Sequence, residues 1–453
     1  MEKKELSQLN VYLILSLCIA IIAGCVLLNA SLAYGFAISI ALCILVFRYK
    51  GFSVSELLSM IASGIMECRL LYVLILLIGV TVSVWIGSGV VPSMIYFGFE
   101  YLKEMNFVLA AFLIVSISSV FMGTAVGTVS TVGLAIFGIG RGLGIPASVL
   151  LGAIVSGAFI ADKVSPISGL LNLSLTATGT DYKKALKSML VTLIPTIIIS
   201  ALIYYYLGMR YNVGADIADI SGLQSSLREG FFISPYLLLM PLLIVIMSSL
   251  GIKIIYSIIA GLFGGVVISL TLQGMSLSKV FNTILFGYRA ETPSLQLNQL
   301  LISGGVISML EVLLIVMGAI ALSSLLDGTG IINKITGRIV SSIKNKGDLI
   351  INTGFISGAL TVLTCDQTMG IVLPGRLLRD KYNELKVERG IFVRTISDTG
   401  TIIAPLMPWN INSLIITMII GTTVAYQPYA VLCYISPIIT LGLGLFHKYR
   451  NKI

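Results

Sequence analysis

Long apolar stretches separated by short polar segments run along most of the chain. Six of these stretches are long enough to cross about 30 Å of hydrocarbon as single helices. They cover residues 11–30, 71–89, 186–207, 233–250, 254–272 and 306–326. Further apolar stretches lie near both ends of the sequence, so the pattern predicts roughly ten to twelve membrane crossings.

Composition supports the same interpretation. Apolar residues make up 57% of the 453 residues, charged residues make up only 11%, and the mean hydropathy is +1.02. A soluble globule of this size would need far more polar surface. We therefore predict an all-α polytopic membrane protein. The first apolar stretch lacks the flanking residues of a cleaved secretory signal, so we expect it to be a retained helix.

The net charge of +9 indicates an orientation in the membrane. Basic residues outnumber acidic residues in segments 334–346 and 376–394 and in the tail at 447–453. The positive-inside rule places these segments in the cytoplasm. The more acidic segment 209–231 lies one crossing beyond the lysines of segment 183–187, so we expect an external loop there. Both termini are then cytoplasmic, with the chain in a bacterial inner membrane.

Several classes of function lack support in the sequence. It contains no Walker lysine motif, haem signature, HExxH motif or evident nucleophile and base pair, so we expect neither an ATP-driven pump nor an enzyme, and no organic cofactor. The basic clusters are separated by apolar stretches, which argues against a nucleic-acid partner. The six cysteines form no CxxC pair. The sole histidine, His447, lies in the tail, so a proton crossing the bilayer must ride on a carboxylate.

Both halves of the chain contain a pair of polar interruptions. They cover residues 122–140 and 157–181 in the first half, and 357–378 and 397–413 in the second half. Paired interruptions are typical of inverted-repeat secondary transporters, where unwound carbonyls hold a cation and half-helix N-termini face an anion. Four prolines, at positions 166, 374, 405 and 408, favour broken helices because proline removes a helix donor. The alternative is structural: hydroxyls bond their own helix backbone, and glycines allow close helix contact.

Three aspartates, Asp162, Asp366 and Asp398, lie beside apolar stretches. An unpaired charge costs roughly 3 kcal/mol or more at the centre of a membrane helix, so such residues are candidates for an ion or proton site. Two structural alternatives remain open. Asp162 could pair with Lys163 at an interface, and Asp366 could pair with Arg376 across a hairpin.

Three further charged residues are candidates for a substrate or proton site. Glu291 could instead form a salt bridge with Arg289 in a loop, whereas Glu311 has no basic residue within two helical turns. Arg376 either anchors a hairpin at the cytoplasmic surface or meets a substrate carboxylate. The basic residues that follow it favour the anchor.

Four segments together resemble the NhaC family of bacterial sodium/proton antiporters, part of the larger ion transporter superfamily. They are "GAFIADKVSPIS", "SGGVISML", "CDQTMGIVLPGRL" and "SDTGTIIAPLMPWN". The resemblance runs in order from about residue 79 to the end. It implies two inverted repeats with broken or re-entrant helices that meet in midmembrane, a homodimer, and sodium or proton coupling. Some members of the family exchange organic anions, such as malate for lactate, or other organic solutes.

The resemblance also implies a set of ion-binding or substrate-binding residues. They are Gly127, Thr128, Asp162, Ser165, Ser168, Asn172, Asp366, Gln367, Asp398, Thr399, Thr401 and Asn410. A sodium ion would be held at Asp366, Asp398 and Thr399, since hard cations prefer several oxygen donors.

The first half departs from the family pattern. Gly169, Leu170 and Leu171 replace an acid and two hydroxyl residues, and Ala125 and Val126 interrupt the usual polar run. Because these changes remove oxygen ligands, we expect the ion site to lie mainly in the second repeat. The first repeat would then shape a cargo pocket.

We therefore predict a secondary transporter that exchanges sodium for protons by alternating access, with residues 1–210 as the first repeat, 211–231 as the external loop and 232–453 as the second repeat. The alternative cargo is an organic anion or amino acid, exchanged or symported with reduced sodium dependence. An ion channel is the alternative from a different class. It is disfavoured because broken helices in both halves suit alternating access.

Overall fold

The computed structural model describes residues 8–28, 30–102, 105–211, 217–250, 252–331, 334, 339–340, 342–420 and 425–450. Within these residues the chain is helical, and extended segments pair only in an isolated bridge between Arg289 and Ile302. Nine helices in the described ranges are long and apolar enough to cross a membrane, or up to eleven if each of two bent pairs is one span. The predicted all-α polytopic fold with broken helices is confirmed.

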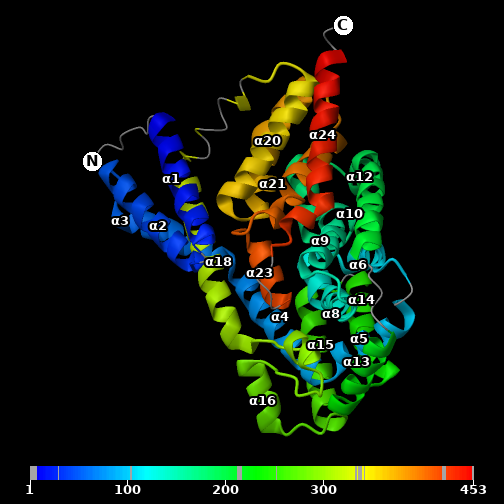
Figure 1. Cartoon of the computed structure of the whole chain (residues 1–453). Coiled ribbons are helices and arrows are strands. Elements are labelled where there is room, and N and C mark those ends of the chain that lie inside the picture. Colours follow the sequence, from blue (N-terminus) through cyan, green and yellow to red (C-terminus); the bar gives the residue numbers. More distant parts are fainter. Residues whose placement is uncertain are drawn as a thin grey trace.

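The first five helices are α1 (Gln8–Leu27), α2 (Leu32–Tyr49), α3 (Val54–Glu67), α4 (Arg69–Gly87) and α5 (Val90–Leu102). They begin at one edge of the molecule, where α1, α2 and α3 lie, and cross its middle through α4 to α5 (Figure 1). Helix α3 begins with a capping box, in which Ser53 and Glu56 satisfy each other's backbone N–H groups. Helices α1 and α4 match the first two predicted crossings to within three residues.

The next eight elements make up the interrupted region of the first half. They are α6 (Phe107–Met122), α7 (Ala125–Thr128), the π-helix η1 (Val129–Gly133), α8 (Leu134–Gly142), α9 (Ala147–Ala158), α10 (Ile160–Val164), α11 (Gly169–Thr178) and α12 (Tyr182–Tyr211). Elements α7, η1 and α8 follow one another without a gap and act as one helix. The chain is unwound between α10 and α11, where Pro166 lies.

A connecting region separates the two interrupted regions. Its elements are α13 (Ile217–Gly230), η2 (Pro235–Leu238), α14 (Leu239–Ser249), α15 (Ile254–Thr271), α16 (Leu277–Phe286), α17 (Leu295–Leu300) and α18 (Gly305–Gly328). Most of the segment expected to be a loop at 211–231 is therefore the helix α13, which meets η2 and α14 at a bend of 87°. Residues 212–216 of that segment lie outside the described ranges.

The second interrupted region is built from eight elements. They are α20 (Lys346–Thr364), α21 (Gln367–Glu384), α22 (Arg389–Ile396), the π-helix η3 (Ser397–Thr401), η4 (Ala404–Leu406), α23 (Ile411–Ile420), η5 (Gln427–Tyr429) and α24 (Val431–Arg450). The chain bends by 46° between Leu406 and Ile411, around Pro408. Pro374 was expected to break a helix, but it lies inside the continuous helix α21.

The two interrupted regions repeat the same backbone at a constant spacing of 242 residues. Helix ends Met122 and Thr364 are 242 residues apart, and α11 and α23 begin at the same spacing. Left-handed backbone recurs in this register, at Gly123 and Cys365 (φ 71° and 60°). The prolines at positions 166 and 408 also correspond. The register defines a first repeat at 107–178 and a second repeat at 349–420, followed by α12 and α24 respectively.

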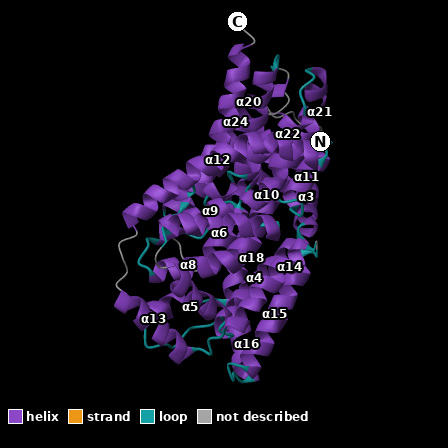
Figure 2. Ribbon diagram, turned by 90° about the vertical axis from the view of Figure 1, so that its right-hand side faces the viewer, coloured by secondary structure: helices purple, strands orange, loops and turns teal. Residues whose placement is uncertain are grey.

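The helices that follow the two repeats run in opposite directions (Figures 1 and 2). Helix α24 leads to the end of the molecule that carries the C-terminus, where Lys448 pairs with Asp348 at 2.9 Å. Helix α12 runs the other way, toward α13 at the opposite end. Opposed directions in matching elements are what an inverted repeat requires.

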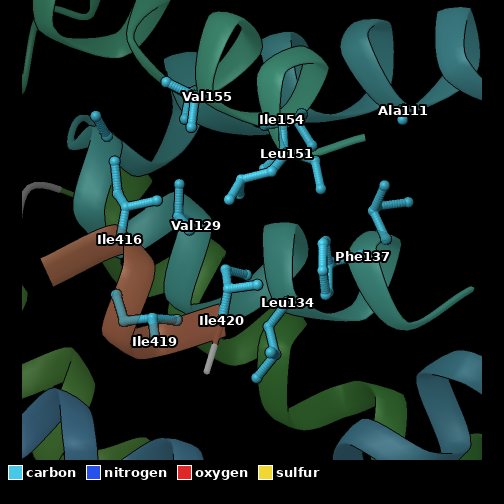
Figure 3. Packing of buried hydrophobic residues seen from close by; sticks show 14 of the residues in the cluster. Ala111, Val129, Leu134, Phe137, Leu151, Ile154, Val155, Ile416, Ile419 and Ile420 are labelled. Atoms are coloured by element: carbon cyan, nitrogen blue, oxygen red, sulfur yellow. The ribbon is translucent and has the colours of Figure 1, made fainter. Parts of the chain in front are cut away.

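The second repeat reaches into the first through α23. Ile416, Ile419 and Ile420 of this half-helix lie beside Val129 and Leu134 of the first repeat (Figure 3). All five side chains are buried. The apolar part of α23 therefore fixes the position of the unwound segment that precedes it, which brings the two breaks close together.

Candidate functional site

The break of the first repeat carries a buried carboxylate, Asp162, on α10. Its side chain is 5% exposed. It accepts hydrogen bonds from the backbone N–H of Ala125, at the start of α7, and from Ser168 Oγ at 3.5 Å. Ser168 also caps α11 by accepting from the N–H of Leu171. Asp162 thus lies where two helix N-termini meet, and their partial positive charge favours a carboxylate there.

No ion pair found in the described ranges involves Asp162. The expected alternative, an ion pair with Lys163, is absent there because Lys163 points to Asp398 instead. Asp366 and Arg376 likewise form no ion pair among the described residues. Asp366 is half-buried at the start of α21, and Arg376 is exposed on that helix.

Asp162 lies on the wall of a cavity of about 770 Å³ that is open to the surface. Both breaks contribute to this cavity, and so do the first turns of α4 and α15. Its polar lining consists of Thr124, Asp162, Asn172, Lys253 and Asn412, and the remaining lining is mainly apolar. The cavity therefore gives a solute access to the carboxylate.

The break of the second repeat is lined by amides. Gln367 Nε2 donates to the carbonyl of Thr401 at 2.6 Å, and Gln367 Oε1 accepts from Asn412 Nδ2 at 3.0 Å. Asn412 Nδ2 and its backbone N–H both donate to Asn410 Oδ1. Two buried polar atoms here, Thr401 Oγ1 and Asn410 Nδ2, have no hydrogen-bond partner among the described residues. Buried polar groups of this kind normally bond something, so water or a solute fits at this break.

The third polar cluster surrounds Asp398, which is fully buried in η3. Its carboxylate forms an ion pair with Lys163 of the first repeat. It also accepts hydrogen bonds from Thr192 of α12 at 2.8 Å, and from Ser436 and Thr440 of α24 at 2.7 and 2.5 Å. The charge of Asp398 is therefore neutralised inside the protein.

A second cavity, of about 910 Å³, lies on the other side of α23. The start of this half-helix, at Asn412, lines the first cavity, whereas Thr417 and Ile420 line the second. The second cavity also contains Arg141, Arg289 and Glu311. The broken helices thus form the partition between two open cavities.

Within the described residues, several predicted site hydroxyls donate to backbone carbonyls, either of their own helix or of an adjacent one. Thr128 Oγ1 donates to Thr124 O, Thr399 Oγ1 donates to Thr395 O, and Ser165 Oγ donates to Val120 O. The carbonyl of Gly127 accepts from Ser130 and Thr131. These contacts match the structural alternative for the hydroxyls.

The two predicted glutamates lie outside the breaks. Glu311 lines the second cavity and accepts a hydrogen bond from Ser31 Oγ at 2.7 Å. Glu291 is exposed in the segment between α16 and α17. The contacts also reveal residues that the sequence did not single out, chiefly Thr192, Asn412, Ser436 and Thr440, and they give Lys163 a different partner from the one considered. The one local signal for them is the four-residue spacing of Ser436 and Thr440 in an apolar helix.

Comparison with known proteins gives the family. A model described as the Na+/H+ antiporter family matches residues 157–448. The chain belongs to this family. The Na(+)/H(+) antiporter NhaC of Alkalihalophilus pseudofirmus is 30% identical to it, over 81% of this chain and 80% of the relative. The NhaC resemblance predicted from the motifs is confirmed, and the protein is a multi-pass secondary transporter whose relatives are antiporters rather than enzymes.

Two other relatives are named for the exchange of organic solutes. The malate-2H(+)/Na(+)-lactate antiporter of Bacillus subtilis is 29% identical over 89% of this chain and 86% of its own length. The arginine/ornithine antiporter ArcD of Halobacterium salinarum is 29% identical over 87% of this chain and 82% of its own length. Family membership therefore gives the class of transporter but not the cargo.

Proposed function

We propose that this protein is a sodium/proton-coupled antiporter in which Asp162 binds the coupling ion. The observation that carries the proposal is the position of Asp162: a buried carboxylate, without an ion-pair partner among the described residues, on the wall of an open cavity. Such a carboxylate can hold a sodium ion or a proton, but not both at once.

Neighbouring oxygen atoms support this assignment. Ser168, a predicted site residue, bonds Asp162 just before α11, and Asn172, another predicted site residue, lines the same cavity one turn further on. The unwound segment 165–168 adds backbone carbonyls within the same break. Oxygen donors of these kinds suit a hard monovalent cation. In this assignment Gln367, Thr401 and Asn410 shape the neighbouring solute path.

The two cavities support alternating access. The basic segments lie near the end of the molecule occupied by α20, α21, α22 and α24 (Figure 2). We place this end in the cytoplasm of a bacterial cell, together with both termini. The first cavity is then cytoplasmic and the second is external, with the inverted repeats between them. The repeats at 107–178 and 349–420 lie inside the two halves expected from the sequence, 1–210 and 232–453, and this division and the homodimer are part of this proposal.

Reconstitution tests the proposed exchange. Purified protein in liposomes that contain a fluorescent pH indicator should release protons when sodium is added outside, and choline should have no effect. Asp162→Asn should abolish the signal, whereas Asn383→Ala, an exposed change outside the cavities, should keep it. Absence of sodium-driven proton flux in the unmodified protein would reject sodium/proton exchange.

An organic solute is the second candidate cargo. The observation that favours it is the second cavity, which is far larger than a sodium ion and presents two guanidinium groups and one carboxylate. Arginine side chains recognise carboxylates well, and Glu311 could meet an ammonium group. Counterflow of labelled malate, lactate, arginine and ornithine in the same liposomes decides between the candidates. A channel would show no one-for-one exchange.

Labelling from outside the cell tests the orientation. Ser225 is exposed on α13, and the six native cysteines are buried or half-buried. Ser225→Cys should react with an impermeant maleimide in intact cells, whereas a cysteine tag after residue 453 should react only after the cells are opened. Crosslinking in native membranes tests the homodimer. External reactivity of the C-terminal tag would reverse the proposed topology.

A further inference from the structure

Lys163 has an environment that differs from that of any other lysine in the described ranges. Its side chain is only 1% exposed, in the middle of the protein. The ammonium group contacts Asp398 Oδ1, Thr192 Oγ1 at 3.2 Å and Ser436 Oγ at 3.4 Å. An ammonium group has three N–H donors, and three oxygens surround this one.

The oxygens around the ammonium form a donor set of the kind that binds a small cation. One carboxylate oxygen and two hydroxyl oxygens contact it directly, and Thr440 Oγ1 donates to the other carboxylate oxygen. Carboxylate and hydroxyl groups are hard donors that suit monovalent cations as well as an ammonium. The arrangement therefore has the composition of a cation site, already filled by a side chain.

The two hydroxyl groups from α24 are directed at the carboxylate rather than at their own helix. In α15, Ser269 and Thr271 donate to the carbonyls four residues earlier, as membrane hydroxyls often do. Ser436 and Thr440 donate to Asp398 instead. Two residues four positions apart on α24 are thus both used to bind one carboxylate.

The polar cluster around Lys163 and Asp398 is not repeated at the 242-residue spacing, although the backbone around it is. In the 242-residue register the counterpart of Asp398 is Ser156, whose hydroxyl bonds Tyr204 at 2.6 Å. The counterpart of Lys163 is Pro405. The ion pair therefore does not follow from the repeat itself. It joins α10 of the first repeat to η3 of the second.

We propose that the Lys163 ammonium is a tethered cation occupying a monovalent-cation site formed by Asp398, Thr192, Ser436 and Thr440. In this arrangement Asp398 does not bind a free sodium ion, because the lysine fills the position. Among the described residues, the other charged group that acts on this pair is Arg394 of α22, one turn before Asp398. The site is separate from Asp162, so this inference goes beyond the proposed function.

Sodium-dependent stability of purified variants tests the proposal. The background is Asp162→Asn, which removes the coupling site that we propose. In this background Lys163→Met should create a saturable rise in Tm with sodium, measured against choline at constant ionic strength. The rise should be a few degrees, because a ligand that binds only the folded state stabilises it. Adding Asp398→Asn should remove the rise, and Thr440→Val should weaken it.

The stability measurements can reject the tethered-cation proposal without rejecting the proposed coupling site, and the reverse. If the Tm of the Asp162→Asn variant still rises with sodium, this result counts against the proposed coupling site. The effect of Lys163→Met is then the difference in that rise between the two variants. A folded Lys163→Met variant without any added sodium response would overturn the tethered-cation proposal. Where the methionine variant fails to fold in choline, Lys163→Gln is used, with sodium present during extraction. Failure of both variants to fold in sodium also overturns it, because sodium then does not replace the ammonium.

Discussion

At the break of the first repeat, the carboxylate of Asp162 faces an open cavity, whereas at the break of the second repeat the amides of Gln367, Asn410 and Asn412 bond one another. The backbones around the two breaks are equivalent, with left-handed residues and prolines in the same register. Their chemistry is not equivalent. The counterpart of Asp162 in the second repeat is Ala404.

This difference shows that the backbone and the side chains of the repeats have separate roles. The repeated backbone decides where helices are interrupted at membrane depth, because unwound backbone must be buried in protein or line a wet cavity. The side chains decide which interruption carries charge. One break presents a carboxylate to the first cavity, whereas the other presents amides, and its carboxylate, Asp366, does not line that cavity. The buried pair of Lys163 and Asp398 lies between the repeats and leaves no net charge.

The largest effect is expected when the buried pair is broken. Asp398→Asn removes the charge that compensates Lys163, and loss of one partner of a buried ion pair costs about 3–5 kcal/mol of folding free energy. We expect a large fall in Tm in detergent. Adding Lys163→Met should recover most of the loss, because the uncompensated ammonium is then removed as well. Equal stability of Asp398→Asn and the unmodified protein would show that the ammonium is compensated elsewhere.

A smaller effect on stability and a strong effect on transport are expected at the first break. Asp162 has no ion-pair partner among the described residues, so Asp162→Asn should change Tm little. Loss of one charged ligand costs about 1.5–3 kcal/mol, or roughly 10–150-fold in sodium affinity. Because Asp162→Asn is expected to abolish sodium-driven proton release, the sodium concentration needed to raise Tm in detergent measures this change.

Asp366→Asn makes the same chemical change, from carboxylate to amide, at the break of the second repeat. Asp366 is half-buried and does not line the first cavity. Its replacement should therefore lower sodium affinity less than tenfold, which corresponds to a loss of less than about 1.4 kcal/mol in binding free energy. The sequence alone places the ion site mainly in the second repeat and so predicts the reverse order. A larger loss in Asp366→Asn than in Asp162→Asn would favour the prediction from sequence over the proposal from geometry.

The fold was largely predictable because its determinants are local. Apolar stretches of sufficient length give membrane helices, and glycine or proline gives the breaks. The predicted crossing at 306–326 lies within α18, for example. The 242-residue register was not predicted, because residues in matching positions, such as Asp162 and Ala404, share no chemistry. The helix α13 was missed because polar residues were interpreted as a loop.

The site was only partly predictable because its contacts join distant segments. Asp162, Ser168 and Asn172 lie close together in the sequence, and the structure keeps them together at one break. The pairing of Lys163 with Asp398 depends instead on how α10 packs against η3. The sequence offered Asp162 as the nearest partner for Lys163, but neighbouring residues on a helix do not face each other.

Gly169 offers the finest test of the difference between the repeats. It lies at the start of α11 on the wall of the first cavity, and a side chain added there would meet no atom within 4 Å. Gly169→Asp would add a carboxylate to the break that already holds Asp162, at a helix N-terminus where an acid is favoured by about 0.3–1 kcal/mol. A second carboxylate near a bound cation contributes about 1 kcal/mol where water is present, which is roughly a fivefold gain in sodium affinity. Gly169→Asn is the matched control, since it adds nearly the same volume without charge and should leave the affinity unchanged. Sodium titration of transport distinguishes the two variants. A similar response to both changes would mean that space at Gly169 matters and charge does not, and the first break would then shape the cargo rather than bind the ion.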